Sequence, residues 1–453
     1  MNDKEIREAQ SKLNMRLPAI NQNEAYFEGK NPCIMNKPTE KKPDNRIPVP
    51  LAKMAVEKMS GYAGRKGDIV SEYDLIDGTA DADNDDFLNY IRAMNEYNDE
   101  ELETAELYEE TNIQGEACEL WWVSDAMTLD SGLMTAEYKI VPIGSVYLHY
   151  TNDIKKALDY GIHFSGDQKL MTATVYEAGL QTTYESTNGS AYSMIEDGEV
   201  ITPFTQVPIN MFRGNRRGTP LFEAEKHLID TFDQLISKSI NEVDRFNAMV
   251  ALFGSQVDQN FVKAFEEAKI AIIDNLDNGE NAGNLPRYLE KNLSGVNEFY
   301  NSLADRVEKL IIKSIGTPDF TDEAFAGAQT GIALKLKLVG MEFKAAQIET
   351  YFNKGLKNRL YLYADIYNAS TKHIEPNDYK INIKANRNLP IDDEAKLRIA
   401  AMLMGLGLDL KHIVNYLPNS IIGAMTEQEI EAMMGVVIEE QEIAPPVEIE
   451  EAE

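Results

Sequence analysis

The stretch TPFTQVPINMFRGNRRGTPLFEAEKHLIDTFDQLISKSINEVDRF, residues 202–246, separates two regions of different character. Upstream, from Glu116 to Met211, short β-rich runs alternate with Asn, Asp and Gly, which predicts an antiparallel sheet region. Downstream, Pro220 opens the longest apolar period of the chain, which predicts a helix about 50 Å long, with Ser237 and Ser239 as candidate break points. The members of this period are Leu221, Leu228, Phe232, Leu235, Val243, Phe246, Val250 and Phe253. The sequence therefore predicts an α+β fold.

Two further long helices are expected after this stretch. The first carries the apolar residues Val296, Phe299, Leu303, Val307, Leu310 and Ile311, and Gly316 with Pro318 should end it. The second is predicted from about Gly331 to Asn368, with a surplus of bases that favours either a functional surface or lysines lying along an amphipathic helix. These bases are Lys335, Lys337, Lys344, Lys354, Lys357 and Arg359. Residues 378–389 are predicted as a last strand, 392–438 as helices and 439–453 as a solvated tail.

The N-terminal part is predicted to be mostly helical. A short helix should come first, followed by an irregular stretch from Asn31 to Pro50 that five prolines interrupt. A helix should then run from Leu51, with Leu51, Met54, Ala55, Lys58 and Met59 at helical spacing, and end at Gly61 and Gly64. Residues 83–111 are predicted as one acidic helix with a solvated face, and its apolar side comprises Phe87, Leu88, Ile91, Met94, Leu102 and Leu107.

Composition restricts the class of protein. The 75 acidic and 44 basic residues give a net charge of -31, which disfavours a tight, electrostatically driven DNA binder, because neutralising phosphates requires Lys and Arg. Much of the excess lies in residues 81–119 and 427–453. Two cysteines, Cys33 and Cys118, cannot form a disulfide framework, and the charged start MNDKEIREAQ does not resemble a signal peptide. We therefore expect a protein of a reducing cytoplasm.

Sequence motifs for catalysis or cofactor binding are absent. There is no GxxxxGK[ST] loop, HExxH helix, CxxC pair or GxSxG elbow, and the five histidines are scattered. The run Asp81, Asp83, Asp85 imitates a calcium loop, but Asp86 and Arg92 stand where that loop needs Gly and Glu. Trp121 and Trp122 lie in a predicted strand, where one should be buried and the other should face the opposite side. We predict no enzymatic activity, metal or cofactor.

Three runs, taken in order, resemble the portal proteins of tailed bacteriophages, in particular the group common in phages of Gram-positive bacteria. They are KKPDNRIPVPLAKMAVEKMSGYAGRKG at 41–67, the stretch 202–246 quoted above, and PDFTDEAFAGAQTGIALKLKLVGMEFKA at 318–345. The resemblance implies a ring with the following parts. Residues 1–219 form a wing, 220–254 and 295–316 a two-helix stem, 255–294 a clip, 317–330 a tunnel loop, 331–391 a long helix with the last wing strand, 392–438 a crown and 439–453 an acidic tail.

The resemblance also implies roles for particular residues. DNA would pass the tunnel residues Asp319, Asp322, Glu323, Gly327, Gly331, Lys335 and Lys337. A packaging motor would dock on the clip residues Asp274, Asp277, Glu280, Arg287 and Glu290. Neighbouring subunits would meet at Phe232, Phe246, Phe299 and Leu303.

The implied partners are about eleven further copies in a closed ring, the terminase ATPase, major capsid and scaffolding proteins, a head-tail connector, and double-stranded DNA passing without sequence specificity. The implied location is the unique capsid vertex of the virion, and the host cytoplasm during assembly. A physical argument also favours a ring, because two apolar helices flanking a small insertion need neighbouring copies to cover them. An acidic wall would also let DNA slide rather than hold it. Two alternatives remain, another head assembly protein and an acid-catalysed hydrolase with paired carboxylates.

Overall fold

The computed structural model describes residues 1–38, 43–63, 71–75, 85–128, 133–167, 169–246, 293–317, 337–370, 373–383, 387 and 402. The chain divides into two units, Met1–Ala328 with Ala333–Arg387, and Gln329–Ile332 with Asn388–Glu453. All described residues except Met402 lie in the first unit. The predicted crown helices and acidic tail therefore lie outside the described residues apart from Met402, as do residues 247–292 of the first stem helix and the clip.

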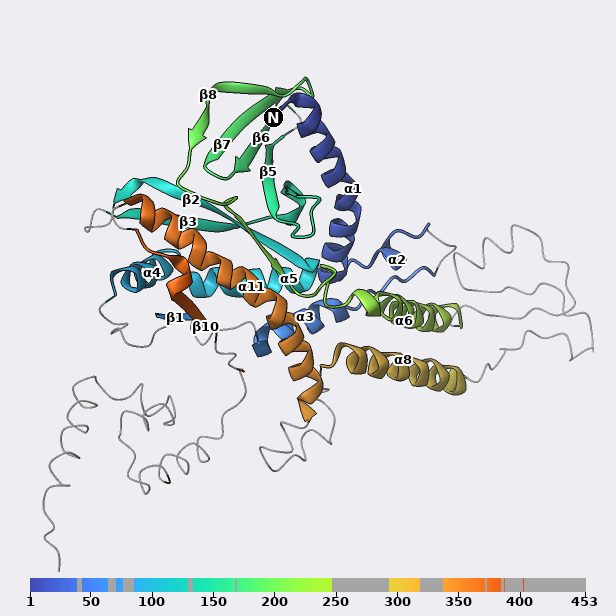
Figure 1. Cartoon of the computed structure of the whole chain (residues 1–453). Helices are drawn as coiled ribbons and strands as arrows, with labels where there is room; N and C mark the ends of the chain where they lie inside the picture. Colours follow the sequence, from blue (N-terminus) through green and yellow to red (C-terminus); the bar gives the residue numbers. More distant parts are fainter. Residues whose placement is uncertain are drawn as a thin grey trace, which may run out of the picture. The chain divides into compact units, whose positions relative to one another are not determined.

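The β-rich region forms two antiparallel sheets (Figure 1). Three strands, β2 (Glu116–Thr128), β3 (Met134–Val141) and β9 (Ile209–Arg213), pair in the order β3-β2-β9. Five strands pair in sequence order, β4 (Val146–Tyr150), β5 (Leu158–Gly166), β6 (Leu170–Glu177), β7 (Leu180–Thr187) and β8 (Ser193–Ile201). A separate pair joins β1 (Ser71–Leu75) to β10 (Tyr379–Ile383), which covers part of the predicted last strand. The chain is α+β, as the sequence predicts.

Strand β2 separates two parts of the core. Trp121 is buried on one face, where its ring stacks on Tyr138 with centroids 4.4 Å apart. This face packs against α4 (Asp86–Tyr97) and α11 (Val339–Ser370). Trp122 belongs to the other face, beside a cluster that includes Cys118 and Leu120. The predicted alternation of the two tryptophans is confirmed, because successive strand residues point to opposite sides.

Helix α1 (Asp3–Phe27) covers the five-stranded sheet (Figure 1). Ile6, Ala9 and Leu13 recur at helical spacing and pack on strand residues such as Ile162 and Val175. Asn2 and Glu5 form a capping box at its start, which satisfies two backbone amides. The prediction of a short first helix was wrong, since α1 spans 25 residues and includes Pro18.

The acidic segment forms two helices, so the predicted single helix over 83–111 was wrong. Asp99, at φ 51°, separates α4 from α5 (Glu100–Gln114). The break shifts the helical phase by about one residue, so that Leu102 is 56% exposed while Glu103 is 4% exposed. Glu103 pairs with Lys139 of β3. The carboxylates of this segment are therefore not only a solvated face.

Two further differences from the prediction concern α6 and α3. The helix α6 (Lys226–Phe246), preceded by the short helix η3 (Glu223–Glu225), is continuous through Ser237 and Ser239, so no break occurs there. Helix α11 is described from Val339 onward, and the predicted start of this helix near Gly331 lies outside the described residues. Met54, expected on the apolar side of α3 (Leu51–Ala63), is exposed. The remaining short helices are α2 (Pro32–Met35), η2 (Ile143–Ser145) and η4 (Pro376–Asp378).

A buried arginine joins α11 to the three-stranded sheet. Arg359, 1% exposed, donates to both carboxylate oxygens of Glu119 on β2, at 2.7–3.1 Å, and Glu119 is 0% exposed. Arg359 Nη1 also donates to Glu100 and Thr104 of α5, at 2.7 and 2.8 Å. Arg359 therefore does not belong to a solvated basic surface on this helix, in contrast to the sequence-based expectation. It links a helix, a strand and a second helix through charge-assisted hydrogen bonds.

Candidate functional site

Helices α6 and α8 (Leu293–Ile315) lie against each other as a hairpin (Figure 1). Ile229 and Phe232 of α6 and Ala304, Ile311 and Ile315 of α8 are buried. Gly316 ends α8 with φ +81°, as the sequence predicts. The hairpin brings together helices from the two segments expected to form a stem, and the role of these helices as a stem stays a prediction.

The face of α6 that meets the N-terminal region is polar. Its residues recur three or four apart: Lys226, Asp230, Asp233, Ser237, Asn241 and Asp244. Lys226 donates to Asn23 at 2.8 Å, and Asp230 accepts from Tyr26 at 2.7 Å, both at the end of α1. The other four residues of this face accept hydrogen bonds from the irregular stretch that follows α2. Together these contacts fix α6 to the N-terminal region.

Residues 43–50, PDNRIPVP, bind this polar face as an extended segment, which we call the clasp. The backbone amides of Asn45, Ile47 and Val49 donate to Asn241, Ser237 and Asp233, at 2.7, 3.0 and 2.9 Å. Two residues of extended chain span about 6.6 Å and four residues of helix about 6 Å, so the two spacings match.

The alternation of prolines in the clasp follows from this contact. Pro48 and Pro50 have no amide hydrogen, and they alternate with the three residues whose amides bind α6. The segment thus leaves no donor unpaired at those two positions. Sequence reasoning read the prolines only as a sign of irregular structure, and it missed that their spacing fits one face of a distant helix.

Asp233 is the buried centre of this contact. Its Oδ1 accepts from the Val49 amide at 2.9 Å, and its Oδ2 accepts from the side chain of Asn31. Burial raises the pKa of the Asp233 carboxyl above its ordinary value, although these two hydrogen bonds oppose the shift. The folded protein therefore holds this proton more tightly than the unfolded chain does.

We expect replacements at Asp233 to distinguish the effect of its charge on stability from the effect of its hydrogen bonds. The stability due to the raised pKa is full below the unfolded value of about 3.9 and is lost as the pH rises through the folded pKa. Asp233→Asn should therefore gain stability relative to the wild type with rising pH, because it cannot ionise and it can donate to the unpaired Asn31 Oδ1. Asp233→Ala should lose about 1–3 kcal/mol at neutral pH, since two donors lose their acceptor. Urea unfolding from acid to neutral pH measures both, and a constant difference between Asp233→Asn and the wild type would contradict the raised pKa.

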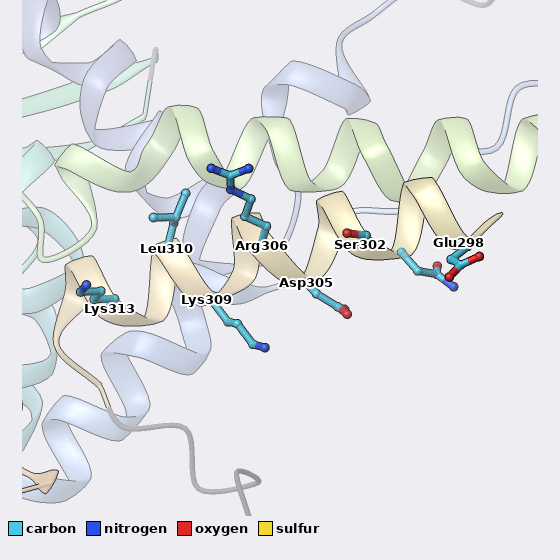
Figure 2. Close-up of a pocket in the computed structure, with 8 residues that line it drawn as sticks. Glu298, Ser302, Asp305, Arg306, Lys309, Leu310 and Lys313 are labelled. Atoms are coloured by element: carbon cyan, nitrogen blue, oxygen red, sulfur yellow. The ribbon is translucent and has the colours of Figure 1, made fainter. Parts of the chain in front are cut away.

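One face of α8 carries exposed side chains, several of which are drawn in Figure 2. Phe299 is 61% exposed and Leu310 is 48% exposed. In Figure 2, Asp305 and Lys309 point away from α6. The cationic groups of Arg306, Lys309 and Lys313 make no ion pair or hydrogen bond with the described part of the chain. A shallow depression along this face is lined by α8 residues alone: Glu298, Asn301, Ser302, Asp305, Arg306, Lys309, Leu310 and Lys313.

Some of the predicted interface residues are buried within the subunit, and others are exposed on its surface. Phe232 is only 7% exposed, so the subunit itself covers most of it. Phe299 is the most exposed of the predicted set whose side chain is described, and Leu303 is half-buried on the same helix. Phe246 ends α6, and its side chain lies outside the description. The interface itself stays a prediction, with Phe299 as its strongest member.

The predicted tunnel and clip residues lie almost entirely outside the described residues. In the tunnel set only Lys337 is described, and it is exposed just before α11. The described residues that flank 318–336 lie close together, because a Cβ at Gly316 would lie 3.0 Å from the carbonyl oxygen of Gly340. The tunnel residues outside the description are Asp319, Asp322, Glu323, Gly327, Gly331 and Lys335, and the clip residues are Asp274, Asp277, Glu280, Arg287 and Glu290.

Metal and membrane sites find no support in the described residues. Within these residues no group of three or more His, Cys, Asp or Glu side chains is arranged to hold a metal ion. Among the helices of the described part, none is both long and apolar enough to span a bilayer.

One comparison with known proteins gives a match over most of the chain. The family described as phage portal protein, SPP1 Gp6-like, matches residues 7–419. No curated protein matches the chain significantly. The matched range includes the clasp, both sheets, the α6–α8 hairpin and α11.

Proposed function

This chain belongs to the phage portal protein family, and from that premise we propose that about twelve copies form a closed ring whose stem is the α6–α8 hairpin. Portal proteins sit at the capsid vertex. The proposed ring would surround a channel through which double-stranded DNA enters during packaging and leaves during ejection. The family is structural rather than catalytic, so a separate ATPase would supply the force.

The observation that carries the ring is the exposed apolar row on α8. Phe299, Leu303 and Leu310 recur at steps of four and seven residues, which places them along one side of the helix. The adjacent side of α8 is buried in the subunit through Ala304 and Ile311. Burying apolar surface is worth about 25 cal/mol per Å², so a neighbouring copy that covers this row gains stability. Repeating such a contact between two different faces forms a ring when the rotation between neighbouring copies closes.

We expect Phe299→Asp and Leu303→Asp to block ring assembly without unfolding the subunit. A carboxylate in the middle of an apolar contact replaces a gain of about 1.5–3 kcal/mol per large side chain with a desolvation cost, once at every interface of the ring. Ser302→Asp is the matched control, because it adds the same charge on an exposed neighbouring position of α8. Native mass spectrometry and electron microscopy measure the assembly. Intact rings from both apolar-row variants would rule out this packing.

The same microscopy separates the classes of protein. Rings with a central hole support the portal assignment at the level of architecture, whereas compact monomers or dimers favour the hydrolase alternative.

We further propose that residues 255–294 form a clip that docks the terminase, that residues 317–330 face the channel, and that residues 1–219 contribute a wing. Capsid and scaffolding proteins and a head-tail connector would be the remaining partners. The net charge of -31 supports an acidic channel wall that lets DNA slide.

A further inference from the structure

The turn 214–220, GNRRGTP, is held rigidly between β9 and η3, and we call it the basic turn. Asn215 Oδ1 accepts from the amides of Arg217 and Thr219, at 2.9 and 3.3 Å, and its Nδ2 donates to the Thr219 carbonyl at 2.7 Å. Gly115, at φ +87°, lies so close to the turn that a Cβ there would be 2.4 Å from the Gly218 carbonyl carbon. The turn therefore presents its two arginines from a fixed backbone.

A cavity of about 310 Å³ lies beside the basic turn. The end of α5, the basic turn, η3 and the first half of α11 line it. Two of its lining side chains are almost fully buried and have an atom without a hydrogen-bond partner, Thr111 Oγ1 and Glu225 Oε2. The other oxygen of Glu225 accepts from Ser314 of α8 at 2.5 Å. Both atoms are closed to solvent, so an incoming group would contact the accessible lining of the cavity rather than these two atoms.

Three cationic side chains also line the cavity, those of Arg216, Arg217 and Lys344. The two arginines are exposed and the lysine is half-buried. Their charged groups make no ion pair or hydrogen bond with the described part of the chain. In a protein with 75 acidic and 44 basic residues, three unpaired cations around one cavity are not explained by the fold. They suit an incoming anionic group.

The cavity suits an anionic partner of limited width. Arg216, Arg217 and Lys344 offer hydrogen-bond donors and no acceptors. Duplex DNA carries anionic phosphates, but a duplex is too wide for a cavity of this volume. A protein segment with carboxylate side chains fits both the charge and the size.

We propose that a second copy of this chain inserts such an acidic segment, with its carboxylates on Arg216, Arg217 and Lys344. The inference rests on the proposed ring. Two observations favour a second copy over another protein. The chain's own surface is rich in carboxylates, given its net charge of -31. The cavity is also continuous with the base of the hairpin, since Glu225 precedes α6 and binds Ser314 of α8. It thus extends the interface proposed for the apolar row on α8.

Carbodiimide cross-linking of assembled rings identifies the occupant. The reagent condenses a lysine amine with a contacting carboxylate into an amide, and the water lost converts the carbodiimide to a urea. Rings assembled from a mixture of unlabelled and heavy-nitrogen-labelled chains should give the Lys344 peptide joined to an acidic peptide of the other isotope. Lys344→Arg should remove this product. A Lys344 cross-link found only within one chain, or no Lys344 cross-link in intact rings, would overturn the proposal.

Charge reversal tests the same contact in solution. Arg216→Glu with Arg217→Glu should lower the fraction of chains in rings by about tenfold at low salt, because like charges then face each other across the interface. Lys155→Glu with Lys156→Glu is the matched control at an exposed loop outside the cavity. Ring formation by the wild type and by the Arg216 and Arg217 variant alike would refute the cavity contact and leave the ring intact. Failure of the wild type itself to form rings would instead refute the proposed function.

Discussion

Replacing Arg359 with leucine is expected to lower the free energy of unfolding by about 3–5 kcal/mol. The substitution removes every cationic partner of Glu119 among the described residues, and Glu119 is 0% exposed. A buried carboxylate without its counter-charge is far more costly than the loss of one hydrogen bond. Because folded domains have a total stability of about 5–15 kcal/mol, this single change should remove a large share of it. The midpoint of urea unfolding measures the effect.

Two further variants show whether the unpaired charge is the cause. Arg359→Leu combined with Glu119→Gln should recover part of the loss, because a neutral amide oxygen still accepts from Trp121 and Asn210. Arg306→Leu is the matched control, since Arg306 is an exposed arginine without an ion pair in the described chain, and its loss should cost within about 0.5 kcal/mol. An Arg359→Leu variant as stable as the wild type would mean that the ion pair contributes nothing net. A double variant less stable than Arg359→Leu would mean that packing, not charge, dominates.

The sequence predicted those parts of the fold that depend on local periodicity. The opposite facing of Trp121 and Trp122 follows from the two-residue period of any strand. The end of α8 at Gly316 follows from the freedom of glycine at positive φ. The class of fold and the family resemblance required no knowledge of contacts between distant segments, and both were confirmed.

The parts that failed depend on tertiary contacts. The apolar residues of 83–111 keep a helical spacing on both sides of Asn98 and Asp99. No local feature of the sequence therefore indicates that Asp99 adopts φ 51° or that Leu102 faces outward. Arg359 has the same sequence context as the neighbouring lysines of its helix, and its burial is explained by distant partners on α5 and by Glu119, 240 residues away. The clasp shows the same limit, because the proline spacing has meaning only beside the polar face of α6. A basic turn with two adjacent arginines, in contrast, is visible in the sequence and was overlooked there.

Deleting Ala326–Ala328 is expected to abolish DNA packaging while rings and empty heads still form. The prediction rests on the proposed role of residues 317–330 as the segment that contacts DNA in the channel. The described residues on either side of 318–336 give a reason why the fold should survive. Gly316 and Gly340 lie in close contact, and α8 and α11 are each anchored by buried residues such as Ile315 and Met341. Shortening a loop whose ends are already held together changes its closure free energy by less than about 0.5 kcal/mol.

The deletion variant should therefore be tested for both assembly and DNA packaging in the same experiment. Electron microscopy of the rings and heads tests assembly, and the DNA content of the heads tests packaging. Lys335→Glu with Lys337→Glu is the companion variant, because it keeps the loop length and reverses two charges next to the start of α11, and Lys337 is exposed there. It should change the packaging rate or DNA retention, since the phosphates would meet repulsion in place of weak attraction. Normal filling of heads by the deletion variant would show that residues 326–328 make no contact that packaging needs, and the tunnel assignment would then be wrong. Loss of rings would instead place the segment in the subunit interface.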